Sequence, residues 1–328
     1  MFKRATLPIT VMTMQQHAFV TRCMYLFAFC FFLWSVVSYQ HMYAQGGGLG
    51  KGKGKGFEHA KKQKERIKNN RIKKEDEEDD LGNKKSSKSY DTRGNKTRET
   101  TYHPNGSVER TVDYAYDSDD DLTEAIVYDE TNTEVSRNKF EYDGKKRIGK
   151  SITRGQGGNV ALTTDFSYDE SDNITDVHGK DSEGKTIRRG HHTYDSSGRL
   201  KETKVYGAND SLTTTVTYAT DDSGNVTEQI TKDAVGSRLQ RTRFEYDNDG
   251  NITHILTYDE HDSLASETVN EFDNKGRIKK TRGKMPALDM EDLIESDYDN
   301  EDNPSEQRTY NKSGQLVETK KYKYEKHP

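Results

Sequence analysis

Carboxylates are the residues of this sequence that could most readily do chemistry, and one tract concentrates them. The stretch DSDDDLTE, residues 117–124, carries alternate carboxylates at Asp117, Asp119 and Asp121, followed by Glu124. Ca²⁺ favours oxygen ligands at such spacing, but the tract lacks the glycine and the twelve-residue frame of an EF-hand loop. The three aspartates are therefore a weak calcium candidate, and an acidic turn is the favoured interpretation.

Histidines and nucleophiles give no stronger signal. His191 and His192 are adjacent, so on a strand they point to opposite faces and cannot easily share one metal site with His178. We expect His192 to pack in an aromatic position. The sequence has no G-x-S-x-G or H-E-x-x-H motif, and its two cysteines, Cys23 and Cys30, lie near the N-terminus. No catalytic residue, cofactor or firm metal site is predicted. A glycosidase would need two acids on one apolar face, and an enzyme is not expected.

Most aspartates belong to a repeat of 26 residues. An aromatic anchor, usually followed by Asp, recurs at this spacing, with Thr220 as the exception; the anchors are Tyr90, Tyr116, Tyr142, Tyr168, Tyr194, Tyr246, Phe272, Tyr298 and Tyr324. An apolar residue follows most anchors at the sixth position. A looser anchor lies twelve residues after the first, as at Tyr102, Tyr128, Tyr206, Tyr258 and Tyr310. Nine units follow one another without insertion, which indicates a repeat architecture.

Each half of a unit has the chemistry of a β-turn between two strands. In DSSGR, residues 195–199, Asp is suited to accept hydrogen bonds from backbone N–H groups two residues on, and Gly takes the left-handed position that closes the loop. Asp172, Asp210 and Asp262 replace that glycine in other units, and Asp also tolerates positive φ. Flanking segments such as LTTTVTY, 212–218, are rich in strand formers. The chain is therefore predicted to be all-β, an antiparallel meander of about 18 strands.

The spacing also predicts which face of the sheet carries the apolar side chains and how the sheet curves. Steps of six or eight residues are even, so every anchor and every aliphatic is expected on one apolar face. The split of the unit into 12 and 14 residues staggers the strands, and such a sheet should coil with its apolar face inward as a spiral or partial shell. Only 30% of the residues are hydrophobic, against about 45–50% usually, which suits a thin wall better than one compact core.

The N-terminal region differs from the repeats in composition. Arg22 precedes the apolar run MYLFAFCFFLWSVV, 24–37, which is shorter than the ~20 residues of a transmembrane helix. Residues 1–44 therefore read as a signal peptide cut after Ala44, with an uncleaved anchor as the alternative. The chain is expected to be secreted, periplasmic or on the cell surface, and to contact a membrane only if the leader is retained.

Residues 45–89 are predicted to be a Gly/Lys-rich and charged linker, with helix as an option over 58–76, and residues 90–328 hold the nine repeats. A basic arm for an anionic polymer is the rival interpretation of the Lys-rich stretch before EDEEDD, 75–80. Nucleic acid is not expected, because the net charge is −5 and no aromatic platform interleaves the basic run.

One unit, TRGKMPALDMEDLIE at 281–295, lacks the turn chemistry. A capping irregularity is the preferred interpretation there, and a short helix or partner-facing flap is the alternative.

The unit pattern in YDSSGRL (194–200), YDNDGNI (246–252) and FDNKGRI (272–278) resembles the YD repeats of bacterial RHS proteins. The resemblance covers about 90–324. It implies a long sheet that spirals into a shell, often around a C-terminal toxin, and carbohydrate binding in some members. This chain is shorter than a full shell and shows no toxin segment after its last repeat. The expectation is a non-catalytic binding or structural scaffold for a carbohydrate or protein partner, without cofactor; the alternative is an encapsulation or delivery component of a toxin system.

Overall fold

The computed structural model describes residues 55–328, with side chains from residue 61 onward; the predicted signal segment lies outside this range. Within these residues the chain forms one α-helix, α2 (Lys55–Asn69), and twenty strands. The strands are β1 (Ile72–Glu78), β2 (Lys84–Tyr90), β3 (Lys96–Tyr102), β4 (Val108–Tyr116), β5 (Leu122–Tyr128), β6 (Glu134–Tyr142), β7 (Ile148–Gly155), β8 (Val160–Tyr168), β9 (Ile174–Lys180), β10 (Thr186–Tyr194), β11 (Leu200–Tyr206), β12 (Leu212–Thr220), β13 (Val226–Asp233), β14 (Arg238–Tyr246), β15 (Ile252–Tyr258), β16 (Leu264–Phe272), β17 (Ile278–Met285), β18 (Met290–Tyr298), β19 (Pro304–Asn311) and β20 (Leu316–Lys326). No helix in this part of the chain is both long enough and apolar enough to cross a membrane.

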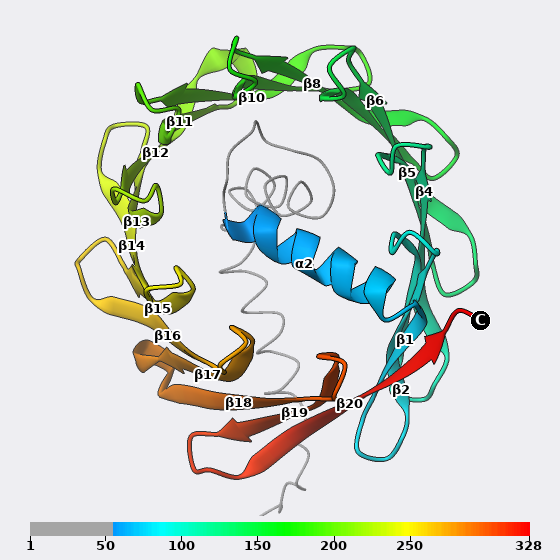
Figure 1. The fold of residues 1–328 in the computed structure, drawn as a ribbon. Coiled ribbons are helices and arrows are strands. Elements are labelled where there is room, and N and C mark those ends of the chain that lie inside the picture. The colour runs from blue at the N-terminus through cyan, green and yellow to red at the C-terminus, as the bar shows by residue number, and fades with distance from the viewer. Residues whose placement is uncertain (1–54) are drawn as a thin grey trace, which may run out of the picture.

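Each strand pairs antiparallel with the next, and β1 also pairs antiparallel with β20, so the single sheet closes into a barrel (Figure 1). The expected all-β meander is confirmed. The expected spiral or partial shell is corrected to a closed barrel, and the count of about 18 becomes 20. The strands from β3 to β20 are the predicted ones, and the two additional strands are β1 and β2. They lie in the stretch 45–89 that was expected to be a linker.

The sequence of β1, IKKEDEE, is a poor strand former, so its pairing has a tertiary origin. Backbone hydrogen bonds to β2 on one side and to β20 on the other occupy both of its edges. Its acids also meet cations of neighbouring strands, as in the contact of 3.2 Å between Glu77 and Lys320. Without β1 the sheet would leave two long unpaired edges, which proteins generally avoid.

The predicted turn chemistry is present throughout the barrel. In the turn after β10, the Oδ1 atom of Asp195 accepts hydrogen bonds from the backbone N–H groups of Ser197 and Arg199, at 2.8 and 2.9 Å. Gly198 closes the turn with a φ of 76°. Asp172, Asp210 and Asp262, which replace glycine in other turns, have φ values of 68°, 58° and 65°. The expectation that Asp and Gly divide these two tasks is confirmed.

The prediction that every anchor lies on one face is wrong, because each turn but one is followed by a β-bulge. At the β6–β7 hairpin, Glu141 pairs with Lys150 and Tyr142 with Ile148, so Gly149 is one residue extra. Register slips of this kind occur at every strand pair except β17–β18. A bulge shifts the alternation of side chains by one. The first anchors therefore share one face and the looser anchors lie on the other.

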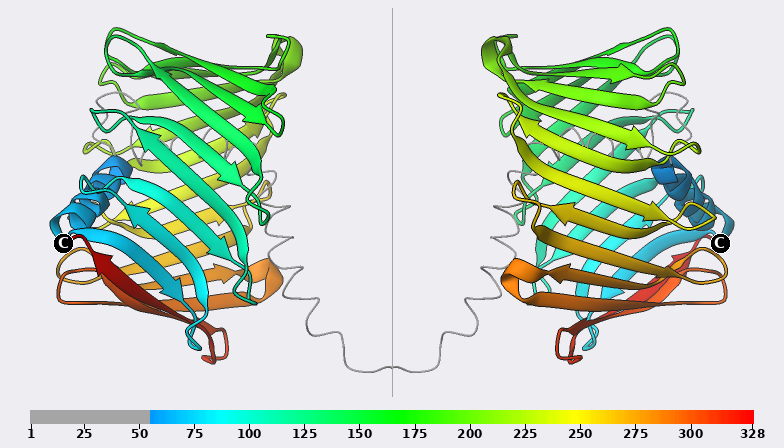
Figure 2. Two further views of the ribbon diagram at one scale, coloured as in Figure 1. Left: turned by 90° about the vertical axis from the view of Figure 1, so that its right-hand side faces the viewer. Right: turned by 90° about the vertical axis from the view of Figure 1, so that its left-hand side faces the viewer.

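Contacts of α2 identify the face that points into the barrel. Ile67 of α2, 2% exposed, packs with the anchors Tyr90 and Tyr324, and the helix lies within the ring in the view along the barrel (Figure 1). The side views place the helix at one end of the cylinder (Figure 2). The first anchors therefore line the lumen, close to the mouth that α2 occupies, whereas Tyr128, Tyr206 and Tyr258 lie on the outer face.

The lumen-side anchors are tied to the wall by their hydroxyl groups. Seven of the anchor tyrosines donate a hydrogen bond of 2.7–3.0 Å to a backbone carbonyl 20 residues earlier in the chain; these are Tyr116, Tyr142, Tyr168, Tyr194, Tyr246, Tyr298 and Tyr324. Between them, Ala125, Phe140, Ile148, Phe166 and Ile174 form a cluster of buried apolar residues. This ladder gives a reason for tyrosine rather than phenylalanine at the anchor.

Candidate functional site

The lumen face is nearly free of charge over most of the barrel. From β5 to β17, the residues that the pairing of the strands places on this face have aromatic, aliphatic, hydroxyl or amide side chains. Arg188 and Asp233 are the exceptions. We call this the neutral sector. Its residues are tightly buried on β6–β12, as at Thr164 and Val216. They are more open on β14–β17, where Ile278, the ladder partner of Phe272, is 36% exposed.

The rest of the lumen face, from β18 through β20 and β1 to β4, carries charges that pair with one another. Glu75 contacts Lys88 at 3.0 Å and Arg66 of α2 at 3.5 Å. Glu99 contacts Lys96 at 2.6 Å. Burial would raise the pKa of the Glu99 carboxyl, but Lys96 and its other hydrogen-bonding neighbours outweigh this effect and hold the pKa below its ordinary value. These acids are held ionised beside cations, a role that stabilises α2 and its wall.

Polar contacts with three turns hold helix α2 at one mouth of the barrel. Arg66 and Asn70 both donate to the side-chain oxygen of Asn303, at 2.6 and 2.9 Å, and Asn303 is only 1% exposed. Lys64 pairs with Asp120 at 3.1 Å. The turn after β2 approaches most closely, because a Cβ atom on Gly94 would lie 2.9 Å from the carbonyl oxygen of Lys64. The turns that follow the anchors thus form a seat for the helix.

The structure does not bring the calcium candidates together. Asp117 accepts hydrogen bonds from the backbone N–H groups of Asp119 and Asp121 at 2.9 and 3.0 Å, as a turn residue does. The Asp119 carboxylate pairs with Lys146 at 2.9 Å. Burial, with the charge of Asp117, raises the pKa of Asp121. Within the described residues, no group of three or more His, Cys, Asp or Glu is placed to hold a metal.

The two adjacent histidines do lie on opposite faces. His191 contacts Asp176 on the outer face at 2.9 Å. His192 lies on the lumen face, where its Nδ1 atom is 2.9 Å from the Thr203 hydroxyl. Burial, with a smaller effect of the His191 charge, lowers the pKa of His192 to about 4. A neutral, packed imidazole agrees with its position in the aromatic slot.

The outer face is covered by ion pairs and by cations over aromatic rings. Arg137 contacts Glu124 and Glu134 at 2.9 and 2.6 Å. Arg189 lies 4.0 Å from the centre of the Tyr206 ring. The outer face therefore differs from the lumen face of the same strands, because its charges are numerous and are paired with one another.

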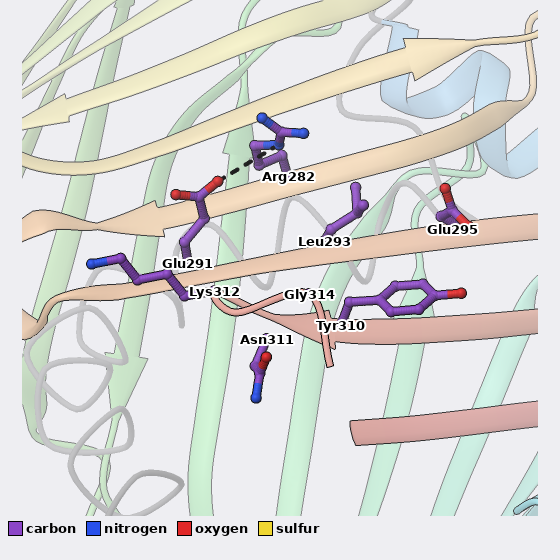
Figure 3. Close-up of a pocket in the computed structure, with 8 residues that line it drawn as sticks. All are labelled: Arg282, Glu291, Leu293, Glu295, Tyr310, Asn311, Lys312 and Gly314. Carbon is purple, nitrogen blue, oxygen red and sulfur yellow. Dashed lines mark ion pairs between the residues drawn. The ribbon is translucent and has the colours of Figure 1, made fainter. Parts of the chain in front are cut away.

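One pocket lies on the outer face, between β17, β18 and β19 (Figure 3). It has a volume of about 340 Å³, and its lining includes Leu293 and Tyr310 with Arg282, Glu291 and Lys312. The unit 281–295 belongs to this region. Instead of the expected cap or flap, it forms two strands joined by a single 3₁₀ turn at Pro286–Leu288. Sequence reasoning missed the pocket, because the bulges decide which residues share a face; the raised apolar content of 281–295 was the available signal.

No protein-family model and no curated protein matches this chain. Among solved structures, a chain of the Photorhabdus luminescens Tc holotoxin pore is similar over 71% of this chain and 19% of its own length, with 12% identity and a TM-score of 0.29. A porin-like protein from Bacteroides uniformis is similar over 77% of this chain and 98% of its own, with 13% identity and a TM-score of 0.36. This chain spans about a fifth of the Tc toxin chain. Likeness at these TM-scores carries no argument about function.

Proposed function

We propose that this chain is a non-catalytic scaffold of the cell envelope or exterior that holds a ligand, a carbohydrate or a protein segment, inside its barrel. The observation that carries the proposal is the neutral sector. A closed barrel of about twenty strands encloses more space than its own side chains fill. A wall of aromatic, hydroxyl and amide groups offers stacking surfaces and hydrogen bonds without selecting for charge.

The part of the neutral sector best suited to contact a ligand lies on β14–β17. Phe244 and Phe272 point into the lumen there and are only half-buried, whereas Phe140 and Phe166 on the opposite part of the wall are buried within the apolar cluster. An aromatic ring must be accessible on one side to stack on a ligand. The half-buried rings therefore carry the proposed contact.

The proposal that the chain is not an enzyme rests on the uses its acids already have. The turn aspartates accept hydrogen bonds from their own backbone, as Asp143 does from Lys145 and Arg147. Acids of the charged sector pair with cations, as Glu77 does with Lys320. A general acid and base need poised, mutually placed groups, and these carboxylates serve the wall instead.

The alternative function is encapsulation or delivery of a separate polypeptide, as the resemblance to YD repeats implies. The closed wall and the helix seated at one mouth favour it. In this case the lumen would hold a chain for transport and show no selectivity among small ligands.

A binding experiment with a matched pair of variants tests the proposal. The purified chain is offered to a panel of envelope and extracellular polysaccharides, and separately to proteins of the same compartment. Phe272→Ala removes a lumen-facing ring from β16, and Tyr258→Ala removes an outer-face ring from the adjacent strand β15. Selective binding that is lost in the first variant and kept in the second supports a ligand in the lumen. Binding that neither variant changes, or no binding to either panel, contradicts it and favours encapsulation.

A further inference from the structure

Exposed apolar side chains gather on three neighbouring hairpin ends at the mouth opposite α2. Seven large hydrophobic residues are exposed in the described chain. Four of them, Leu81, Leu288, Leu316 and Val317, lie at the β1–β2, β17–β18 and β19–β20 hairpins. These hairpins are side by side, because β18 pairs with β19 and β20 with β1. We call these four residues the seam patch. Exposed apolar groups that cluster in this way mark interaction sites rather than ordinary surface.

The outer pocket adjoins the seam patch through Tyr310 and Leu293. Tyr310 lines the pocket and is the ladder partner of Leu316. Leu293 is in turn the ladder partner of Tyr310. The same part of the wall thus combines protruding apolar side chains with a hollow in which Leu293 and Tyr310 lie among charged side chains (Figure 3).

The charges around the pocket are of both signs. Glu295 is closely paired, with Lys280 at 2.8 Å, whereas Arg282 and Glu291 are only loosely paired. Arg282 and Glu291 approach no closer than 3.8 Å, and both side chains are partly open to water. Lys312 pairs with Asp289 at the tip of the next hairpin. A partner of either single sign would meet as much repulsion as attraction here. A second copy related by a two-fold axis that passes between Arg282 and Glu291 would instead place each of these charges against its opposite, because residue i of one copy then meets residue j of the other.

We propose that the seam patch and the outer pocket form the interface of a homodimer, in which Arg282 of one copy faces Glu291 of the other. The seam patch supplies the apolar core of the contact, and the charges supply its register. This inference is independent of the proposed ligand, because it concerns the outer face and not the lumen.

The oligomeric state over a range of concentrations tests the apolar part of the interface. Sedimentation of the full chain should show a dimer that dissociates on dilution. Leu288→Asp combined with Leu316→Asp should weaken the dimer at least tenfold. Val235→Asp is the matched control, since Val235 is 87% exposed at the same mouth but on the β13–β14 hairpin, and it should leave the dimer intact. All three residues are exposed, so circular dichroism should show unchanged folding. A wild-type monomer at every concentration, or equal loss in the control, overturns the proposal.

Two charge reversals test the register. Arg282→Glu leaves two anions at the contact, and Glu291→Arg leaves two cations, so each variant alone should be mainly monomeric. An equimolar mixture should form a mixed dimer, because each copy then meets the opposite sign. A mixture that stays as monomeric as its components shows that these residues do not face one another and overturns the proposed arrangement.

Discussion

Two turn glycines, one of which contacts α2 and one of which does not, allow the docking of the helix to be tested. Gly94 and Gly106 both close turns with a φ of +84°. A Cβ on Gly106 would meet nothing within 4 Å, whereas a Cβ on Gly94 would lie 2.9 Å from the Lys64 carbonyl oxygen and 3.3 Å from Lys68 Cβ. Gly106→Ala therefore introduces backbone strain alone, and Gly94→Ala introduces the same strain together with a clash against α2.

The expected magnitudes follow from this difference. Left-handed strain costs a non-glycine residue about 1–2 kcal/mol, and this should lower the free energy of unfolding in both variants alike. At Gly94 the helix must also move by about 0.5 Å to restore an ordinary contact of 3.4 Å. Overpacking of this kind costs about 1–3 kcal/mol. The clash should weaken the docking of α2 and leave the sheet intact, because the helix can move away without unpairing a strand.

Hydrogen exchange of the backbone amides in 61–69 measures the docking directly. In Gly94→Ala we expect exchange in α2 to be faster by about 5- to 150-fold, the factor that 1–3 kcal/mol gives at 1.4 kcal/mol per tenfold. In Gly106→Ala the helix should exchange as in the unchanged protein, although urea unfolding shows a comparable loss of stability. Equal exchange of α2 in the two variants would refute the argument that the Gly94 contact seats the helix.

Three further substitutions test other parts of the structure. Tyr142→Phe removes a ladder hydrogen bond of 2.8 Å and should lower the free energy of unfolding by about 1 kcal/mol; urea unfolding of Tyr128→Phe, on the outer face, is the control, and an equal loss there would contradict the role of the ladder. His192→Phe should reduce the acid sensitivity of the fold. Burial lowers the pKa of His192 to about 4 from 6.5, so between these values the unfolded chain binds a proton that the folded chain does not. Stability is therefore complete above pH 6.5 and falls with falling pH, by on the order of 3 kcal/mol at pH 4. Parallel stability profiles for the variant and the unchanged protein between pH 7.5 and 4.5 would contradict this. Asn303→Ala removes the oxygen that accepts hydrogen bonds from Arg66 and Asn70 and should loosen the helix by about 1–3 kcal/mol in hydrogen exchange. Asn173→Ala, at the same turn position in another unit, should not loosen it.

The turns and strands could be predicted from the sequence because they depend on residues close together in the chain. A turn needs a capping carboxylate and a residue that tolerates positive φ, and both can be read from five consecutive residues, as at 195–199. The strands from β3 to β20 follow from those turns. The interpretation of His192 as a packed aromatic substitute also needed only the repeat, since the position is aromatic in other units.

The candidate surfaces could not be read in the same way. Bulges such as the one at Gly149 change which residues share a face. The spacing of residues in the sequence does not reveal where these bulges occur. The rings that could contact a ligand, such as Phe272, and the residues of the outer pocket, such as Tyr310, were therefore assigned to the same face before the structure separated them. A one-residue slip reverses every later side chain, which is why this part failed.

The repeat alone specifies an antiparallel meander of 26-residue units with aspartate–glycine turns. Closure of the meander through β1, and the place of α2 at one mouth, depend on contacts between segments far apart in the chain. The residues of β1 have no local preference for a strand. Within 61–69, α2 is held by the buried Ile67 and by polar contacts to turns far along the chain. Such elements form only because the finished wall offers them hydrogen bonds and charges, and those partners exist only once the chain has folded.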